Sequence, residues 1–181
     1  SLDTSFDTGA AALTSAAFGS GGSKLYVADF TNQEIVGYTL STAFDLSSTI
    51  TIDGTLDVSG QGGDITGVEL GGGDLFTITN AASTVYKYDF NSSLSSATFS
   101  GETFDASSDT SDPRDLEFSN DGSTLFITGF GSNLIYQYES EADFKAEFRL
   151  DVSELSPTDL FGSKTTDNLP EGSSNLYYTD Q

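Results

Sequence analysis

The stretch Thr124-Leu125-Phe126-Ile127-Thr128-Gly129 decides the fold, because variants of it recur along the chain. The other copies are Lys24-Leu25-Tyr26-Val27-Ala28-Asp29, Asp74-Leu75-Phe76-Thr77-Ile78-Thr79 and Asn175-Leu176-Tyr177-Tyr178-Thr179-Asp180. Their leucines stand at 25, 75, 125 and 176, so successive copies are 50, 50 and 51 residues apart. A second pattern keeps the 50-residue spacing with the tyrosines at 38, 88 and 138. Matched segments at a constant spacing indicate an internal repeat.

Each period contains four short strand signals separated by turn residues. In the clearest unit the first strand is Asp115-Leu116-Glu117-Phe118, and the turn Asn120-Asp121-Gly122-Ser123 follows it. The second strand begins at Thr124, the third spans 134–138 and the fourth spans about 146–152. Apolar and polar residues alternate with period two in these runs, which predicts a nearly all-β chain.

A period of about 50 residues with four antiparallel strands is typical of one propeller blade. The repeat has a mechanical reason, since a single blade cannot bury both of its faces and has to stack on its neighbours. The predicted fold class is therefore all-β, with β-propeller-like blades of four antiparallel strands and about three and a half blades in this chain. The predicted organisation is one repeat domain spanning 1–181, with a partial blade in 1–18, repeats at about 19–70, 71–119 and 120–163, and a partial last blade in 164–181.

The run LYVADFTNQEIVGYTLSTAFDLSST, residues 25–49, resembles the YVTN- and NHL-type propeller repeats. It is closer still to an acidic repeat of about 50 residues that is common in secreted bacterial and phage structural proteins. The segment DPRDLEFSNDGS, residues 112–123, matches the same pattern, although the Pro113-Arg114 pair occurs only in this repeat. The resemblance implies a propeller and an extracellular or surface protein. It implies little about activity, because propellers include enzymes, receptors and scaffolds.

Composition excludes several classes of function. The chain has 28 Asp plus Glu against 6 Lys plus Arg, a net charge of −22. Binding to nucleic acid or to an anionic membrane surface needs clustered cations, so neither is expected. The absence of Cys and His removes thiolate and imidazole metal sites and Ser-His-Asp triads. No run approaches the roughly 18 apolar residues of a membrane span, and membrane insertion is not expected either.

The repeat count predicts incomplete ends. Ser5-Phe6-Asp7 matches Thr103-Phe104-Asp105, the end of a fourth strand, and the sequence stops at Gln181 inside a blade. Because the chain also lacks Met, we expect a processed precursor, a fragment or an excised domain. An open arc leaves bare blade faces and strand edges. Two chains could close a seven-bladed ring, copies could join head to tail, a longer protein could supply the rest, or Leu2 to Asp7 could complete a fourth blade.

Self-association is accordingly the expected partner interaction. The residues predicted to mediate it lie in the two end segments: Leu2, Phe6, Leu176, Tyr177 and Tyr178.

The densest run of carboxylates is a candidate calcium site. Asp105, Asp109, Asp112 and Asp115 lie between a fourth strand and the next first strand, where carboxylates and carbonyl groups can supply the oxygen ligands that Ca²⁺ prefers. The spacing is not that of an EF-hand, so a solvated connecting loop is the favoured reading. No other cofactor is expected. Asn91, in Asn91-Ser92-Ser93, is a candidate N-glycosylation site.

The sequence favours an extracellular or virion or cell-surface protein without enzymatic activity. We expect a structural subunit of a filament or appendage that self-associates through its incomplete blades. A first alternative is an adhesin-like module that binds a carbohydrate or a receptor through its loops, with or without calcium. A second alternative is a propeller hydrolase or lactonase, which needs carboxylates that converge near the propeller axis.

Overall fold

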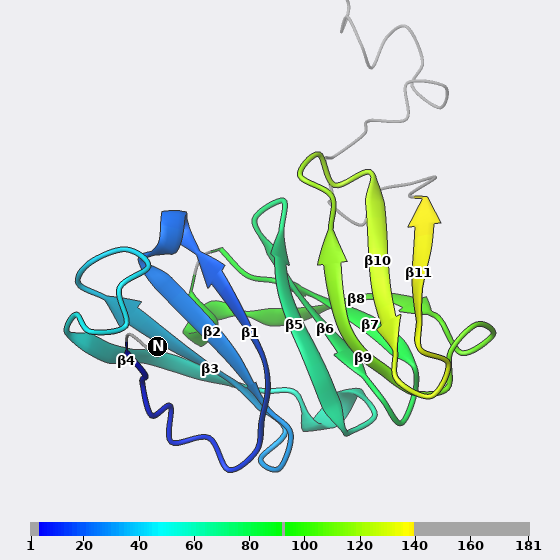
Figure 1. Cartoon of the computed structure of the whole chain (residues 1–181), viewed down its shortest axis with the longest axis horizontal. Helices are drawn as coiled ribbons and strands as arrows, with labels where there is room; N and C mark the ends of the chain where they lie inside the picture. The colour runs from blue at the N-terminus through cyan, green and yellow to red at the C-terminus, as the bar shows by residue number, and fades with distance from the viewer. Residues whose placement is uncertain (1–3, 92, 140–181) are drawn as a thin grey trace, which may run out of the picture. The chain divides into compact units, whose positions relative to one another are not determined.

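The computed structural model describes residues 4–91 and 93–139, which lie in one compact unit of the chain. These residues form three antiparallel sheets (Figure 1), which we call blades 1, 2 and 3. Blade 1 contains β1 (Leu13–Gly19), β2 (Lys24–Asp29), β3 (Glu34–Leu40) and β4 (Ile50–Asp57). Blade 2 contains β5 (Ile65–Gly71), β6 (Asp74–Thr79), β7 (Thr84–Asp89) and β8 (Thr98–Asp105). Blade 3 contains β9 (Pro113–Phe118), β10 (Thr124–Gly129) and β11 (Leu134–Glu139).

The strands pair in chain order within each blade, and this confirms the prediction of an all-β fold built from blades. Blade 1 begins with β1 at Leu13, whereas the predicted repeat of about 19–70 begins after this strand. The predicted fourth strand of blade 3, at about 146–152, lies outside the described residues.

The turns explain why strands form where they do. The β2–β3, β6–β7 and β10–β11 turns all end on a residue with positive φ at the same repeat position: Gln33 (56°), Ser83 (49°) and Asn133 (55°). The β9–β10 turn places Gly122 at φ 74°, the conformation that glycine adopts without strain. The turn residues singled out in the sequence therefore sit where the chain reverses.

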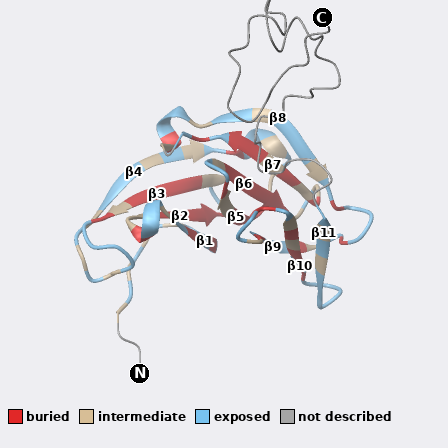
Figure 2. Cartoon of the chain, turned by 90° about the horizontal axis from the view of Figure 1, so that it is seen from above, coloured by how far each residue is buried: buried red, intermediate tan, exposed pale blue. Residues whose placement is uncertain are grey.

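Two layers of apolar side chains hold the three blades together. Between blades 1 and 2, Tyr26 and Ile35 pack in one buried cluster with Val68, Leu75 and Tyr88. Figure 2 shows the buried residues concentrated in the middle strands, whereas the outer strands β4, β8 and β11 are mostly exposed.

The second layer repeats the first at the same sequence positions. Phe76 and Val85 of blade 2 lie in a buried cluster with Leu116, Leu125 and Ile127 of blade 3. Blade 2 thus buries one face against blade 1 and the other against blade 3, as the repeat requires.

Candidate functional site

The two ends of this stack differ, and the first end is covered by the chain's own N-terminal segment, residues 4–12. The Phe6 ring packs edge-on against Tyr38, with 5.2 Å between ring centroids. The Tyr38 hydroxyl donates a hydrogen bond to the carbonyl oxygen of Thr8. Beneath it, Leu25 and Val27 of the outward face of blade 1 are buried.

Phe6 packs on blade 1 in the way that the last strand of blade 2 packs on blade 3. Phe104, near the end of β8 in blade 2, packs on Tyr138 of blade 3 with ring centroids 4.8 Å apart, and Tyr138 is the repeat counterpart of Tyr38. The Tyr138 hydroxyl also donates to the preceding connector, at Asp109. The match of Ser5-Phe6-Asp7 to a strand end, seen in the sequence, therefore corresponds to a similar packing contact.

Asp29 anchors the same segment. Its carboxylate is fully buried and accepts hydrogen bonds from the backbone N–H groups of Ala11 (2.8 Å), Ala12 (3.2 Å) and Thr31 (3.0 Å). The Asn32 side-chain amide donates a further bond of 2.9 Å. Burial alone raises the pKa of Asp29, but the backbone donors outweigh it and hold the pKa below its ordinary value of 3.8.

None of the residues in 4–91 and 93–139 covers the other end, the outward face of blade 3; we call this the open face and define it by Phe126, Thr128 and Ile135. The Ile135 side chain is 71% exposed, whereas its counterparts Ile35 and Val85 are 0% and 2% exposed. A hollow of about 250 Å³ on this face is lined by the three residues together with Asp115, Leu116 and Glu117. The positions that are buried between blades elsewhere are therefore accessible here.

The first strands of the three blades meet through hydrogen bonds between blades. Thr14 in β1 donates through its hydroxyl to the Ile65 carbonyl of blade 2 (3.4 Å), and Thr66 in β5 donates to the Pro113 carbonyl of blade 3 (3.1 Å). Both threonines stand at a β-bulge, where the pairing register of the first strand shifts. A bulge redirects the side chain, and here it points the hydroxyl at the next blade.

A longer connection joins blade 1 directly to blade 3. The Ser15 hydroxyl donates a 3.0 Å hydrogen bond to Asp115 Oδ1. Burial raises the pKa of the Asp115 carboxyl above 3.8, although the Ser15 bond opposes this effect. Gly67 of blade 2 lies at the same repeat position, and a Cβ there would be 2.9 Å from Asp115 Oδ1.

The four carboxylates predicted to bind calcium have different protein partners. Asp105 accepts a hydrogen bond from the backbone N–H of Ser107 (2.8 Å). The Ser107 hydroxyl, followed by this N–H, lowers the pKa of Asp105. Asp109 accepts a hydrogen bond from the Tyr138 hydroxyl, and Asp112 forms an ion pair with Arg114 at 2.9 Å. Asp115 accepts a hydrogen bond from Ser15 of blade 1. In residues 4–91 and 93–139 no group of three or more acidic side chains is arranged to hold a metal ion. In the described residues these carboxylates therefore stabilise turns and blade contacts, and calcium binding by the run stays a prediction.

The remaining candidate residues fall at or beyond the limits of the described chain. Asn91 follows β7 in a turn, with φ 46°. The assembly residues Leu2, Leu176, Tyr177 and Tyr178 lie outside the described residues. No helix in the described ranges is long and apolar enough to cross a membrane.

Comparison with known proteins supports the fold. No family model and no curated protein sequence matches the chain, so the likeness to YVTN- and NHL-type repeats stays a prediction. Solved structures do match, and one is a luciferin-regenerating enzyme, with 16% identity and a TM-score of 0.52 over 71% of this chain and 41% of that one. Another is the β-propeller domain of Cps50 (Swd1) from Myceliophteria thermophila, with 11% identity and a TM-score of 0.52 over 70% of this chain and 38% of that one.

A third match is hydrazine synthase from Kuenenia stuttgartiensis, with 12% identity and a TM-score of 0.51 over 76% of this chain and 35% of that one. This chain spans less than half the length of each of these three structures. At such identities the likeness concerns the fold alone, and the functions of the three proteins differ. The described part of the chain is thus a set of β-propeller blades.

Proposed function

We propose that this chain is a non-enzymatic structural module of an extracellular or surface assembly, and that a second copy of it binds the open face of blade 3. The observation that carries the proposal is the exposure of Ile135, at a position that is buried in both blade interfaces of the same chain. Exposure of such an apolar face to water is unfavourable, and large exposed apolar patches therefore favour association.

The two unequal ends support a symmetric pairing. The outward face of blade 1 is already covered by residues 4–12, so it offers no second apolar surface without rearrangement. Open faces of two copies can instead meet around a two-fold axis, which gives a closed dimer rather than an endless fibre. The charge of −22 keeps such dimers apart from one another.

The carboxylates beside the open face predict how dimer formation depends on salt concentration. Asp115 and Glu117 lie beside the open face, and in a two-fold pair they approach carboxylates of the other copy. Screening by salt weakens this repulsion, so the dimer is expected to tighten as ionic strength rises.

The test compares two isoleucines of similar exposure in the full chain. Ile135→Lys places a charge on the open face, whereas Ile52→Lys does so on the outer strand of blade 1, where Ile52 is 73% exposed. By light scattering and native mass spectrometry over a range of concentrations, we expect wild type and Ile52→Lys to dimerise and Ile135→Lys to stay monomeric. A wild type that is monomeric at every concentration overturns the proposal. Equal dimerisation of both variants overturns it as well.

Intramolecular covering of the face is a separate outcome. Residues 157–180 carry two further strand motifs of the repeat, and they could occupy the face in place of a second copy. In that case the chain is monomeric and the amides of β10 and β11 are protected from hydrogen exchange in the monomer, which contradicts binding of a second copy.

A further inference from the structure

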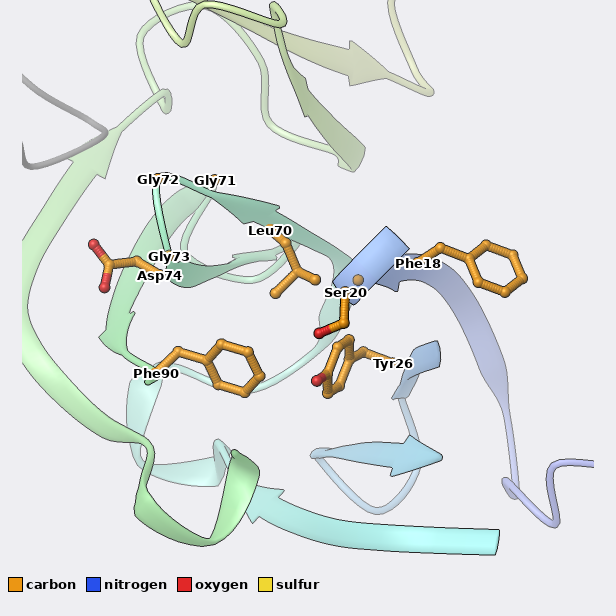
Figure 3. Close-up of a pocket in the computed structure, with 10 residues that line it drawn as sticks. Phe18, Ser20, Tyr26, Leu70, Gly71, Gly72, Gly73, Asp74 and Phe90 are labelled. Atoms are coloured by element: carbon orange, nitrogen blue, oxygen red, sulfur yellow. The ribbon is translucent and has the colours of Figure 1, made fainter. Parts of the chain in front are cut away.

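A pocket opens between blades 1 and 2, at the turns that join β1 to β2 and β5 to β6 (Figure 3). Its volume is about 220 Å³. It is lined by the rings of Tyr26 and Phe90, by Leu70 and Ser20, and by the backbone of Gly71–73. The pocket therefore combines aromatic walls with hydroxyl and peptide groups, the usual composition of a small-molecule site.

Tyr26 gives the pocket a polar group that the other blades lack. The counterparts of Tyr26 in blades 2 and 3 are Phe76 and Phe126, so among the three described blades the hydroxyl at this repeat position occurs in blade 1. The Tyr26 side chain is 1% exposed, and its hydroxyl has no hydrogen-bond partner among the described residues. Burial is the main reason that the pKa of Tyr26 rises to about 12, so the group is a neutral donor and acceptor.

The Tyr26 hydroxyl is not among the fully buried polar atoms without a partner, so the small exposed part of Tyr26 leaves this group accessible to a molecule in the pocket. By contrast, the buried Tyr88 hydroxyl has a partner, the Gln61 side chain at 3.0 Å. In Figure 3 the Ser20 side chain points toward the Tyr26 ring, so the two hydroxyl groups lie on the same pocket wall. A bound molecule with hydroxyl groups of its own would satisfy both.

The rim adds an exposed aromatic surface. Phe18, which lines the pocket, is 43% exposed and lies 5.2 Å from the ring of Phe44, which is 66% exposed. Phe44 lies close over the backbone of Gly22, where a Cβ would be 2.3 Å from the ring. Exposed aromatic faces beside a polar pocket suit a ligand that has both apolar C–H faces and hydroxyl groups.

The charges near the pocket exclude an anionic ligand. Asp74 lines the pocket, and its carboxylate is 3.6 Å from the Lys87 ammonium group, which also pairs with Glu102 at 2.9 Å. Lys87 therefore has its charge compensated by two carboxylates and is not available to bind a phosphate, sulfate or carboxylate group. With a net charge of −22 over the chain, a neutral ligand is favoured.

We propose that this pocket binds a neutral pyranose sugar, one ring of a glycan, with its C–H face against the exposed Phe18 ring at the rim. The Tyr26 and Ser20 hydroxyls and the peptide groups of Gly71–73 hydrogen-bond the ring hydroxyls. This site lies between blades 1 and 2 and is separate from the open face of blade 3.

The test uses full-length protein with Tyr26→Phe, which removes one oxygen and installs the residue that blades 2 and 3 already carry. The control is Tyr136→Phe, which removes a hydroxyl from β11 in blade 3. The probes are the methyl glycosides of glucose, galactose, mannose and N-acetylglucosamine, with glucuronic acid as an anionic comparison. Binding is followed by titration calorimetry and by the amide NMR signals of Gly71–73.

We expect at least one neutral glycoside to bind, with the dissociation constant about three- to tenfold weaker in Tyr26→Phe and unchanged in Tyr136→Phe. Ser20→Gly, which suits the positive φ of 49° at this position, is expected to weaken binding as well. No binding of any neutral probe overturns the proposal. So does binding that Tyr26→Phe leaves intact, or a preference for glucuronic acid.

Discussion

The Ser15 hydroxyl and the Asp115 carboxylate are joined by a 3.0 Å hydrogen bond although they are 100 residues apart. They occupy the same repeat position in blades 1 and 3, and the equivalent residue of blade 2 is Gly67. The same repeat position thus carries a hydrogen-bond donor in blade 1, a glycine without a side chain in blade 2 and an acceptor in blade 3. The bond fixes blade 1 relative to blade 3 across the blade that lies between them in sequence.

Gly67→Ala is expected to strain this connection. The added methyl group would lie 2.8 Å from Ile78 Cγ2 and 2.9 Å from Asp115 Oδ1, closer than stable contacts allow. We expect the free energy of unfolding, measured by urea denaturation, to fall by about 1–3 kcal/mol. Gly54→Ala is the control, because its Cβ would make an ordinary 3.5 Å contact with Leu94. Equal loss in both variants would contradict the argument from crowding.

Asp29→Asn is expected to change the acid stability of the protein. The folded pKa of Asp29 lies below 3.8, so its ionised form stabilises the fold above that pH, and the contribution is lost as the pH falls through the folded pKa. The variant should be less stable at neutral pH by about 1–3 kcal/mol. The difference from wild type should shrink in acid.

Unfolding curves recorded across this pH range measure the difference directly. Asp89→Asn, an exposed carboxylate at the end of β7, is the matched control. A stability difference between Asp29→Asn and wild type that stays constant below pH 3.8 would show that the charge of Asp29 is not the stabilising factor.

Phe6→Ala is expected to release the N-terminal segment from blade 1. The variant loses the ring contact with Tyr38 and uncovers the buried face that contains Val27. Because Phe6 is partly buried, we expect a loss of about 1–3 kcal/mol in the free energy of unfolding. Hydrogen exchange of the Ala11 and Ala12 amides should accelerate as well. Phe44→Ala removes an exposed ring and should leave both measurements unchanged; a similar loss there would count against a specific role for Phe6.

The sequence predicts the blades well because the forces that form them are local and repeated. The leucines at 25, 75 and 125 and the tyrosines at 38, 88 and 138 lie at equivalent positions of equivalent strands. Period-two alternation and turn chemistry depend on neighbouring residues only, and therefore they can be seen in one sequence.

Contacts between blades were harder to predict. Nothing near Asp115 in the sequence indicates a partner 100 residues away, and the sequence offers its carboxylate only as a candidate calcium ligand in a connecting loop. The sequence predicts Phe6 as an assembly residue; the structure places it on Tyr38 of its own chain, and a role in assembly stays a prediction. The pocket has one signal in the sequence, namely Tyr26 at a position where blades 2 and 3 carry phenylalanine.

The bulge threonines have a consequence for recombination between repeats. Thr14 and Thr66 donate to backbone carbonyls, and a carbonyl is present whatever residue the next repeat carries there. A foreign repeat grafted behind either threonine would keep its docking bond. Arg114 fills the third such position, where it pairs with Asp112 and stacks on Phe130 at 4.7 Å, so blade 3 lacks the threonine that would make this bond to a grafted repeat.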